Sequence, residues 1–473
     1  MKKPGMDPAR RAIDELLEEA LVSDAAAFDS IVRETPVAKL RLGAEAYGTP
    51  QYFLDVDQLR ARAASFMSTM QRSIPKCSCC YAFKCNDLPL LVRTLGAEGF
   101  QADVAGLFEL QLALRLGFDT ILFSSPGKSV DELRLAIKHR DRVVINVDNM
   151  DELLTLRALT EGKRTRRKVR VGFRLSPETS RRPGQPWSKF GLSFDELDEA
   201  IRIVDGARGL AWAGLHIHTS WNKTPERYVE NIRRIAAFLK TRAAPDRVRA
   251  LSFIDLGGGF YPEQQANLLK GEDKGIVLEL LASRLGDTNG LNPAADFEPH
   301  GFRVTPVSSL PTFAKAIGDA VRSELAPLNP DLVVYLEPGR YLATHPTTIL
   351  LTVTAAKGDC VIMDGGINML GDYKFSEYSF SPVVNLTRPS TELHRRVIYG
   401  PLCDPHDLWG YSHYGEELRK GDVVAVLHQG AYTFSTAWRF IKAVPQYVAF
   451  EGGRLSLAKK EERFRDRYAG CAF

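Results

Sequence analysis

The amino-acid sequence predicts an α/β protein in which a TIM (β/α)8 barrel precedes an all-β domain. Eight short apolar, β-branched or aromatic runs alternate with helical patterns between residues 79 and 337. Strands that alternate with helices form parallel sheets, and eight units over roughly 260 residues match the size of a TIM barrel. An open doubly wound sheet is the alternative for this part. After residue 341 short strand-like runs follow one another with little helix between them, which is typical of an all-β domain.

The elements can be placed in order along the chain. The barrel strands are predicted at residues 79–84, 100–104, 120–124, 142–147, 168–174, 210–218, 251–256 and 332–337. Helical patterns lie between them, including those at 87–98, 107–117, 129–140 and 225–244. In the all-β domain, strands are predicted within 347–366, 394–400, 421–434 and 447–458, where glycines mark the turns.

The N-terminal part combines a helix with a strand. Leucines and alanines at helical spacing after Pro8 predict a helix over residues 7–33. The domain organisation that follows is a helical extension (1–36), a strand contributed to the β-domain (37–52), the barrel (53–340) and the C-terminal β-domain (341–473).

Length, composition and charge exclude several classes of protein. A chain of 473 residues exceeds the size of one hydrophobic core, so two domains are expected. The net charge of +4 is small for this length and gives no reason to expect nucleic acid or an anionic membrane as a partner. No apolar run approaches the ~18 residues of a membrane span. The N-terminus lacks the apolar core of a secretory signal.

Cysteine usage indicates a reducing compartment. Seven cysteines are an odd number for a disulfide framework, so free thiols in a cytoplasm are expected. The cluster CSCC at 77–80 lacks the paired CxxC spacing of a structural zinc site and runs into an apolar strand. No metal is therefore expected.

Polar residues recur where the predicted barrel strands end, which is where TIM barrels place their active sites. Each of them alone has a structural interpretation, for example a core histidine or a surface lysine. Their recurrence at one barrel mouth predicts a functional site. The residues are Lys84, Asp103, Ser124, Ser125, Asn146, Arg174, His216, His218, Gly257, Gly258, Gly259, Glu337 and Arg340.

Three of these features together favour one cofactor. Consecutive glycines after a strand let backbone N–H groups approach a phosphate, and Arg340 adds a cation that can bind it. Lys84 can form a Schiff base with an aldehyde. A lysine and a phosphate site at one barrel mouth predict pyridoxal 5′-phosphate (PLP). Glu337 is then the candidate for holding a proton on the pyridine nitrogen.

A Gly/Pro-rich turn late in the chain, GPLCDPHDLWG at 400–410, carries a thiol beside a carboxylate. Taken alone, Cys403 and Asp404 read as part of an ordinary surface turn. The turn belongs, however, to a larger set of motifs that resembles the fold-type III PLP-dependent decarboxylases, the group of ornithine, arginine and diaminopimelate decarboxylases. The other motifs are YAFKCN, DVAGLFEL, SKFG, GLHIH, DLGGGF, EPGR and GAYTF. The resemblance covers roughly residues 35 to 450. It implies an alanine racemase/ornithine decarboxylase-like fold and a head-to-tail homodimer with shared active sites.

The resemblance also implies roles for individual residues. Lys84 is similar to the lysine that bonds to PLP, and Cys403 to the cysteine that reaches the partner subunit's cofactor and returns a proton after CO₂ leaves. Asp404 resembles the acid that meets the substrate's distal amino group. An ion pair between Lys189 and Asp407 of the partner chain is implied as well. The residues implied to bind the cofactor are Lys84, Asp103, Arg174, His218, Ser220, Gly257, Gly258, Gly259, Glu337, Arg340 and Tyr432.

Two departures from the family pattern bear on the function. The family often follows the stacking histidine with Gly-Ser, whose serine touches phosphate, whereas this chain has His218-Thr219-Ser220-Trp221. Diaminopimelate decarboxylases carry an arginine shortly after the DGG of the β-domain, and none occurs in DGGINMLGDYKFSEY, although Lys374 could substitute. A diamino acid or a conjugated relative, as in polyamine, lysine or siderophore-type pathways, is the expected substrate.

Two other functions remain open at this point. A PLP-dependent racemase would share the barrel, but racemases of this fold use a tyrosine as second base and lack GPLCD. A PLP-free paralogue would be expected to lose cofactor residues, whereas Lys84, Glu337 and Arg340 are all present. Decarboxylation is therefore preferred.

Overall fold

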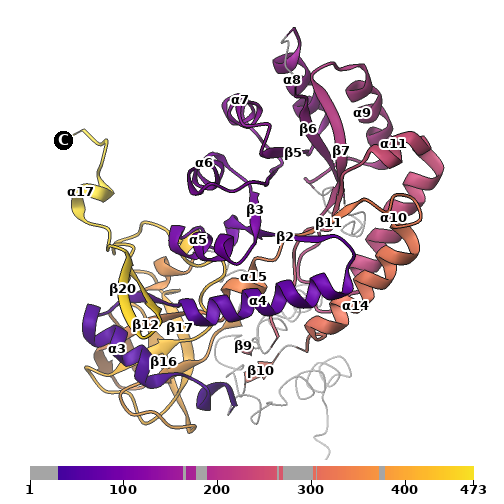
Figure 1. Ribbon diagram of the computed structural model, residues 1–473. Coiled ribbons are helices and arrows are strands. Elements are labelled where there is room, and N and C mark those ends of the chain that lie inside the picture. The colour runs from indigo at the N-terminus through magenta and orange to yellow at the C-terminus, as the bar shows by residue number, and fades with distance from the viewer. Residues whose placement is uncertain are drawn as a thin grey trace, which may run out of the picture. The chain divides into compact units, whose positions relative to one another are not determined.

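The computed structural model describes residues 30–162, 167–176, 189–263, 266–269, 302–304, 306–371 and 379–472. The chain divides into two compact units (Figure 1). One contains Val56–Glu263 and Val307–Ala343, and the other contains the described residues of Met1–Asp55, Gln264–Pro306 and Thr344–Phe473. The helix predicted over residues 7–33 lies almost wholly outside the described residues.

The first unit is a closed barrel of eight parallel strands in the order β11-β2-β3-β4-β5-β6-β7-β8. The predicted barrel is confirmed, and the open sheet is excluded. Each of the eight predicted strands is present. Their bounds are β2 Cys77–Ala82, β3 Gln101–Val104, β4 Ile121–Ser124, β5 Val143–Val147, β6 Val169–Leu175, β7 Leu210–Ile217, β8 Phe253–Asp255 and β11 Val333–Leu336.

Helices follow the barrel strands and surround them (Figure 1). Strands buried on both faces read as continuous apolar runs, as β5 (VVINV) does, and the helices supply the outer cover. Ser129 and Ser193 begin α7 and α9 as capping boxes, with Glu132 and Glu196. The helices are α4 Val56–Ser73, α5 Pro89–Ala97, α6 Leu107–Leu116, α7 Val130–Lys138, α8 Met150–Thr160, α9 Phe194–Gly206, α10 Glu226–Arg242, α11 Pro245–Ala250, α14 Leu310–Ala320 and α15 Arg340–Ala343.

The second unit is built on a nine-stranded mixed sheet in the order β13-β16-β17-β15-β18-β12-β1-β19-β20, with a three-stranded sheet β10-β9-β14. The predicted all-β domain is therefore confirmed. The strands are β1 Gln51–Asp55, β9 Ala266–Leu269, β10 Phe302–Val304, β12 Thr347–Lys357, β13 Cys360–Met363, β14 Ser379–Phe380, β15 Val383–Asn385, β16 Leu393–Tyr399, β17 Leu408–Tyr414, β18 Val423–Val426, β19 Gln446–Glu451 and β20 Arg454–Lys459; a short helix, α17 (Phe464–Arg467), follows them.

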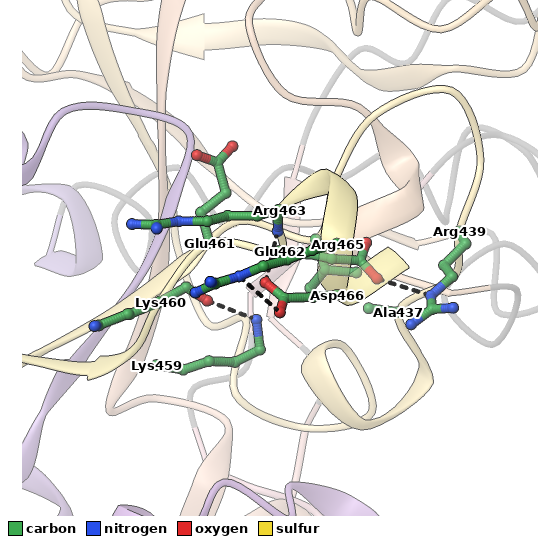
Figure 2. Close-up of a pocket in the computed structure, with 10 residues that line it drawn as sticks. Ala437, Arg439, Lys459, Lys460, Glu461, Glu462, Arg463, Arg465 and Asp466 are labelled. Atoms are coloured by element: carbon green, nitrogen blue, oxygen red, sulfur yellow. Dashed lines mark hydrogen bonds and ion pairs between the residues drawn. The ribbon is translucent and has the colours of Figure 1, made fainter. Parts of the chain in front are cut away.

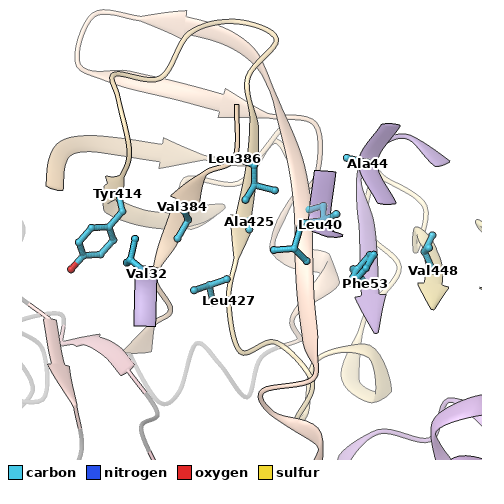
Figure 3. Packing of buried hydrophobic residues seen from close by; sticks show 11 residues of the cluster. Val32, Leu40, Ala44, Phe53, Val384, Leu386, Tyr414, Ala425, Leu427 and Val448 are labelled. Carbon is cyan, nitrogen blue, oxygen red and sulfur yellow. The ribbon is translucent and has the colours of Figure 1, made fainter. Parts of the chain in front are cut away.

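The strand predicted over residues 37–52 is wrong for most of its length. Val37–Tyr47 forms a helix, α3, and only β1, which begins at Gln51, pairs with β12 and β19. Leu40, Gly43 and Ala44 are its buried residues, and their spacing is helical rather than alternating. Leu40 and Ala44 join a hydrophobic cluster with Phe53, Leu350 and Val448, among others (Figure 3). Packing against this cluster outweighs the weak strand pattern.

No helix among the described residues is long and apolar enough to cross a membrane.

Candidate active site

Lys84 and Asp103 form an ion pair at the carboxyl ends of two neighbouring barrel strands. Lys84 lies in the single helical turn Phe83–Cys85 that follows β2, and Asp103 lies in β3. The Nζ atom of Lys84 donates to Oδ2 of Asp103 at 2.7 Å, and Oδ1 of Asp103 is buried without a hydrogen-bond partner. Burial and the charge of Glu337 raise the pKa of Asp103, which Lys84 lowers in turn. The Lys84 side chain is 34% exposed, so its amine is accessible to a ligand.

Glu337 faces two imidazoles at the end of β7, which β8 separates from β11 in the barrel. It follows β11, whereas His216 lies in β7 and His218 just after it. Its Oε1 and Oε2 atoms lie 3.7 Å from Nε2 of His216 and 3.5 Å from Nδ1 of His218. Burial alone would raise the pKa of Glu337, but the two imidazoles and Lys84 lower it well below its usual range. The carboxylate is therefore ionised at the centre of the mouth.

The two histidines are held in their neutral forms. Burial lowers the pKa of both His216 and His218. The backbone N–H of Gly258 lies 3.1 Å from Nδ1 of His218, and Nε2 of the same ring lies 3.4 Å from Oγ of Ser220. With Glu337, both histidines could also hold a metal ion, because the three ligand atoms lie within 4.8 Å of one another.

The glycine run after β8 is packed too closely for any side chain. A Cβ atom on Gly258 would lie 2.1 Å from the carbonyl oxygen of Glu337, and one on Gly259 would lie 2.1 Å from the carbonyl oxygen of Thr219. Gly257 and Gly259 also have positive φ angles, +68° and +88°. The run is thus a backbone surface that a ligand can approach closely.

Side chains that the sequence analysis did not single out hold this loop in place. Tyr228 donates its hydroxyl to the carbonyl of Gly258 at 2.6 Å, and Nδ2 of Asn222 donates to the same oxygen at 3.3 Å. The backbone N–H of Gly257 donates to Oδ1 of Asp255 at 2.9 Å. Burial and the charge of Glu337 raise the pKa of Asp255 well above its usual value. Asp255 lay within the motif DLGGGF, whereas no local pattern marks Asn222 or Tyr228.

The remaining strand-end residues form a separate polar network. Asn146 donates to Oγ of Ser124 at 3.0 Å, and Arg174 pairs with Asp148 at 3.2 Å. Arg174 also lies over the ring of Phe190, 4.3 Å from its centroid. These contacts link Arg174 to neighbouring loops of the mouth, and its Nε atom is buried without a hydrogen-bond partner.

Lys128 is a further residue of this network that the sequence analysis missed. Its ammonium group donates to the carbonyls of Ser125 and Asn146 and to Oε1 of Glu152, each at 2.8 Å. Burial lowers the pKa of Lys128, and Glu152 raises it. All three donors are used, so Lys128 joins the loops structurally and is not free to act as a base.

Glu109, in the first turn of α6, is a further acid near Lys84. Its Oε2 atom accepts the backbone N–H of Ala105 at 2.6 Å. Burial raises the pKa of Glu109 to about 7, opposed by that backbone hydrogen bond and by the Lys84 charge. It lay within the motif DVAGLFEL, but neither composition nor spacing distinguishes it from a helix-capping acid.

The second unit carries the turn with Cys403 and Asp404. Cys403 is exposed, and Oδ1 of Asp404 accepts the backbone N–H of His406 at 2.9 Å. This bond, and then the His406 side chain, lower the pKa of Asp404. Tyr432, in the same unit, is half-buried with a positive φ of 55°.

Asp407 has a structural position that weakens the expected ion pair with a partner's Lys189. It is 1% exposed, and its two carboxylate oxygens accept the backbone N–H groups of Ile367 at 2.8 Å and Leu402 at 2.6 Å. The carboxylate therefore fastens its own turn. Lys374, the possible substitute for the family arginine, lies outside the described residues.

A cavity of about 570 Å³ in the second unit contains none of the predicted residues (Figure 2). Five basic and three acidic side chains line it, and some of them pair, as Arg439 does with Glu462 at 2.8 Å. We assign this cavity no chemistry.

Comparison with known proteins decides the family. Residues 58–284 match the model of the pyridoxal-dependent decarboxylase pyridoxal-binding domain. The chain is 27% identical over 447 residues to the diaminopimelate decarboxylase of Bacillus subtilis, covering 89% of this chain and 91% of the relative. The chain belongs to the fold-type III PLP-dependent decarboxylases.

Other members of the family act on different substrates. The decarboxylase is 26% identical over 408 residues to the L-glutamyl-[BtrI acyl-carrier protein] decarboxylase of Niallia circulans, with 82% and 85% of the two chains covered. Among solved structures, it resembles the lysine/ornithine decarboxylase of Vibrio vulnificus complexed with putrescine, with a TM-score of 0.63, 25% identity and coverage of 88% and 99%. Relatives at this distance establish a PLP-dependent amino-acid decarboxylase but leave its substrate open.

The residues of the barrel mouth fit the cofactor. The glycine run offers a surface without side chains, and Lys84 presents an accessible amine. Oε1 of Glu337 and Oδ1 of Asp103 are buried acceptors without a hydrogen-bond partner in the protein. A protonated ring nitrogen suits an ionised carboxylate, so the site is compatible with PLP at each of these points.

Proposed function

We propose that this decarboxylase acts on an amino acid with a distal amine, a diamino acid or a conjugated derivative, and releases the amine and CO₂. The observation that carries the substrate class is Asp404. Its pKa is lowered, so it presents a negative charge beside Cys403, where a substrate ammonium group can pair with it. The absence of arginine from residues 364–378 supports a substrate without a second carboxylate.

We assign the cofactor contacts by the family motifs and the geometry of the mouth. Lys84 would bond to the aldehyde carbon of PLP, and Glu337 would bind the ring nitrogen. His218 would lie against the ring face, and Gly257, Gly258, Gly259 and Arg340, with Ser220 and Tyr432, would hold the phosphate. Arg174 and Asp103 would act on the cofactor through other residues, and Asp103 would do so by holding the Lys84 amine.

The protein's own part in the reaction is to orient the substrate and to move protons. Bound PLP supplies an electron sink for the pair that remains on Cα when CO₂ leaves. Glu337 keeps a negative charge at the ring nitrogen and so favours its protonated state. Cys403 would donate the proton that Cα requires, because its thiol carries an S–H proton that can be transferred. Asp404 would hold the substrate's far end.

A substrate panel tests this proposal. Purified holoenzyme is incubated with L- and D-ornithine, L- and D-lysine, meso-diaminopimelate and L-glutamate, and with the thioester of L-glutamate, and CO₂ release is measured. A diamino acid should give the highest kcat/KM. Asp404→Asn should raise KM for that substrate about tenfold or more, since a charge-assisted contact is lost. If L-glutamate or its thioester is preferred and Asp404→Asn leaves KM unchanged, the distal-amine proposal is wrong.

Diaminopimelate is the second candidate, because the Bacillus subtilis relative is named for it and Lys374 lies in the stretch where the family arginine would lie. Lys374→Ala separates the two. It should raise KM for meso-diaminopimelate and leave KM for ornithine or lysine unchanged.

We also propose a homodimer in the cytoplasm; all seven cysteines are free thiols, as that compartment requires.

A further inference from the structure

Trp221 has a backbone conformation that a bulky side chain rarely adopts. Its φ angle is 61°, in the left-handed region that favours glycine and asparagine. Its side chain is not buried enough to explain this, since the residue is 38% exposed. Strained conformations of this kind persist where the surroundings impose them, and they cluster at ligand sites. Trp221 also lies in the stretch His218-Thr219-Ser220-Trp221, which departs from the Gly-Ser pair that often follows this histidine in the family.

The indole ring of Trp221 stacks on the guanidinium group of Arg340. The Cζ atom of Arg340 lies 4.1 Å from the ring centroid, a short distance for a cation–π contact. The ring of Tyr261 lies 5.8 Å from that of Trp221, inclined by 43°. A planar guanidinium can stack its face on a flat ring while its N–H donors point outward along its edge.

The chain segments that carry Trp221 and Arg340 are hydrogen-bonded to the glycine run. Asn222, next to Trp221, donates its backbone N–H to the carbonyl of Gly259 at 2.8 Å and its side-chain amide to that of Gly258. Glu337, three residues before Arg340, donates its backbone N–H to the carbonyl of Gly257 at 2.9 Å. The loop that carries the indole and the loop that carries the guanidinium are thus fixed to the same backbone surface.

We propose that Trp221 is a positioning residue for the cofactor phosphate. Its ring holds the Arg340 guanidinium in one orientation, and the loops that carry the two side chains are hydrogen-bonded to Gly257–Gly259. Arg340 makes the charge-assisted contact, and Trp221 acts through it. The proposal rests on the cofactor and is independent of which amino acid is decarboxylated.

The substitution Trp221→Asn distinguishes the effect of the indole ring from the effect of the backbone conformation. Asn is among the residues best suited to a positive φ, so Trp221→Asn should keep or raise the melting temperature of the apoenzyme while removing the stack. The apoenzyme is prepared from the full chain by hydroxylamine treatment, and PLP affinity is measured by equilibrium dialysis. We expect affinity to fall about tenfold for Trp221→Asn and less than about threefold for Trp221→Phe, which keeps an aromatic face.

The matched control is Lys76→Asn. Lys76 also has a positive φ, 49°, but lies directly before β2, at the amino end of the barrel strands. The Lys76→Asn variant should relieve the same kind of backbone strain without changing PLP affinity. Unchanged affinity in Trp221→Asn would overturn the proposal.

A double-mutant cycle tests whether Trp221 acts through Arg340. On an Arg340→Lys background, which lacks the planar group, Trp221→Asn should weaken PLP binding by less than about twofold. Inorganic phosphate, used as a competitor of PLP, should show the same pattern. A full tenfold loss on the Arg340→Lys background, or a lower melting temperature with additive effects, would mean that Trp221 merely supports the fold.

Discussion

The barrel mouth and the turn at residues 400–407 carry the two halves of the proposed chemistry in opposite environments. In the mouth, Asp103, His216 and Glu337 are 1–2% exposed and face one another. In the turn, Cys403 is exposed, and Asp404 pairs with the side chain of His406, which is itself 76% exposed. The mouth therefore has its protonation states set by burial within one chain.

This difference shows which part of the site one chain completes. Buried charges persist only when they are paired, so the mouth is organised before any ligand arrives. The turn offers a thiol and an ionised acid to solvent, where neither can select a substrate. If the turn functions as proposed, something must cover it, and the family resemblance makes the second subunit the expected cover.

Loss of the amine at the mouth should have the largest effect. Lys84→Ala removes the group proposed to bond to PLP, and kcat should fall by at least about 10³-fold. The visible absorbance of covalently bound PLP should disappear from dialysed protein. Lys76→Ala, a change at an exposed lysine paired with Asp331, should retain both. Persistence of the absorbance in Lys84→Ala would show that another lysine holds the cofactor.

Crowding the glycine run should have the next largest effect. Gly258→Ala places a Cβ atom 2.1 Å from the Glu337 carbonyl, so the loop must move. We expect a loss of about 2 kcal/mol in unfolding free energy and weaker PLP binding. Gly127→Ala, at a glycine with open space around it, serves as the control. Equal melting temperatures for the two variants would contradict the close packing described for the mouth.

The pH dependence of stability measures how strongly the mouth perturbs its acids. Burial raises the pKa of Glu109 from 4.5 to about 7, so the folded protein retains a proton there that the unfolded chain has lost. This contribution is complete below pH 4.5 and declines as the pH rises to about 7. The difference in unfolding free energy between wild type and Glu109→Gln should therefore fall by about 2 kcal/mol across that range. A flat difference in urea titrations would show that Glu109 is solvated.

Changing the turn should have the smallest effect on stability but a specific effect on products. Cys403→Ala should bind PLP and release CO₂, yet misdirect the returning proton, so that part of the product is an aldehyde with pyridoxamine phosphate. Cys471→Ala, at the other exposed cysteine, should keep the full yield of amine. The same result for Cys403→Ala would remove its proposed role.

The sequence predicted the barrel because apolar strands and amphipathic helices are local patterns. All eight strands were located, since each is a short buried run bounded by polar or glycine residues. Helix α3 was missed because VAKLRLGA fits both periods, and only the cluster around Phe53 favours the helical one. A choice of that kind depends on residues distant in sequence.

In the site, too, some features follow from local patterns and others depend on residues distant in sequence. Lys84, Glu337 and the glycines stand at strand ends, so their meeting at the mouth followed from the fold. The ties of Asn222 and Tyr228 to Gly258, and the use of Lys128 in a buried network, depend on loop conformations that no local pattern encodes. Likewise, the buried position of Asp407 could not be anticipated from a motif implying an exposed partner contact.

Subunit complementation tests most directly the claim that the mouth and the turn act together across two chains. Lys84→Ala and Cys403→Ala are mixed under conditions of demonstrated subunit exchange, and amine formation is measured. Random mixing makes about half of the dimers mixed, and each mixed dimer has one site with both changes and one with neither. The account predicts recovery of about a quarter of the wild-type rate of amine formation, above that of either variant alone. No recovery despite exchange would mean that each site is built from a single chain.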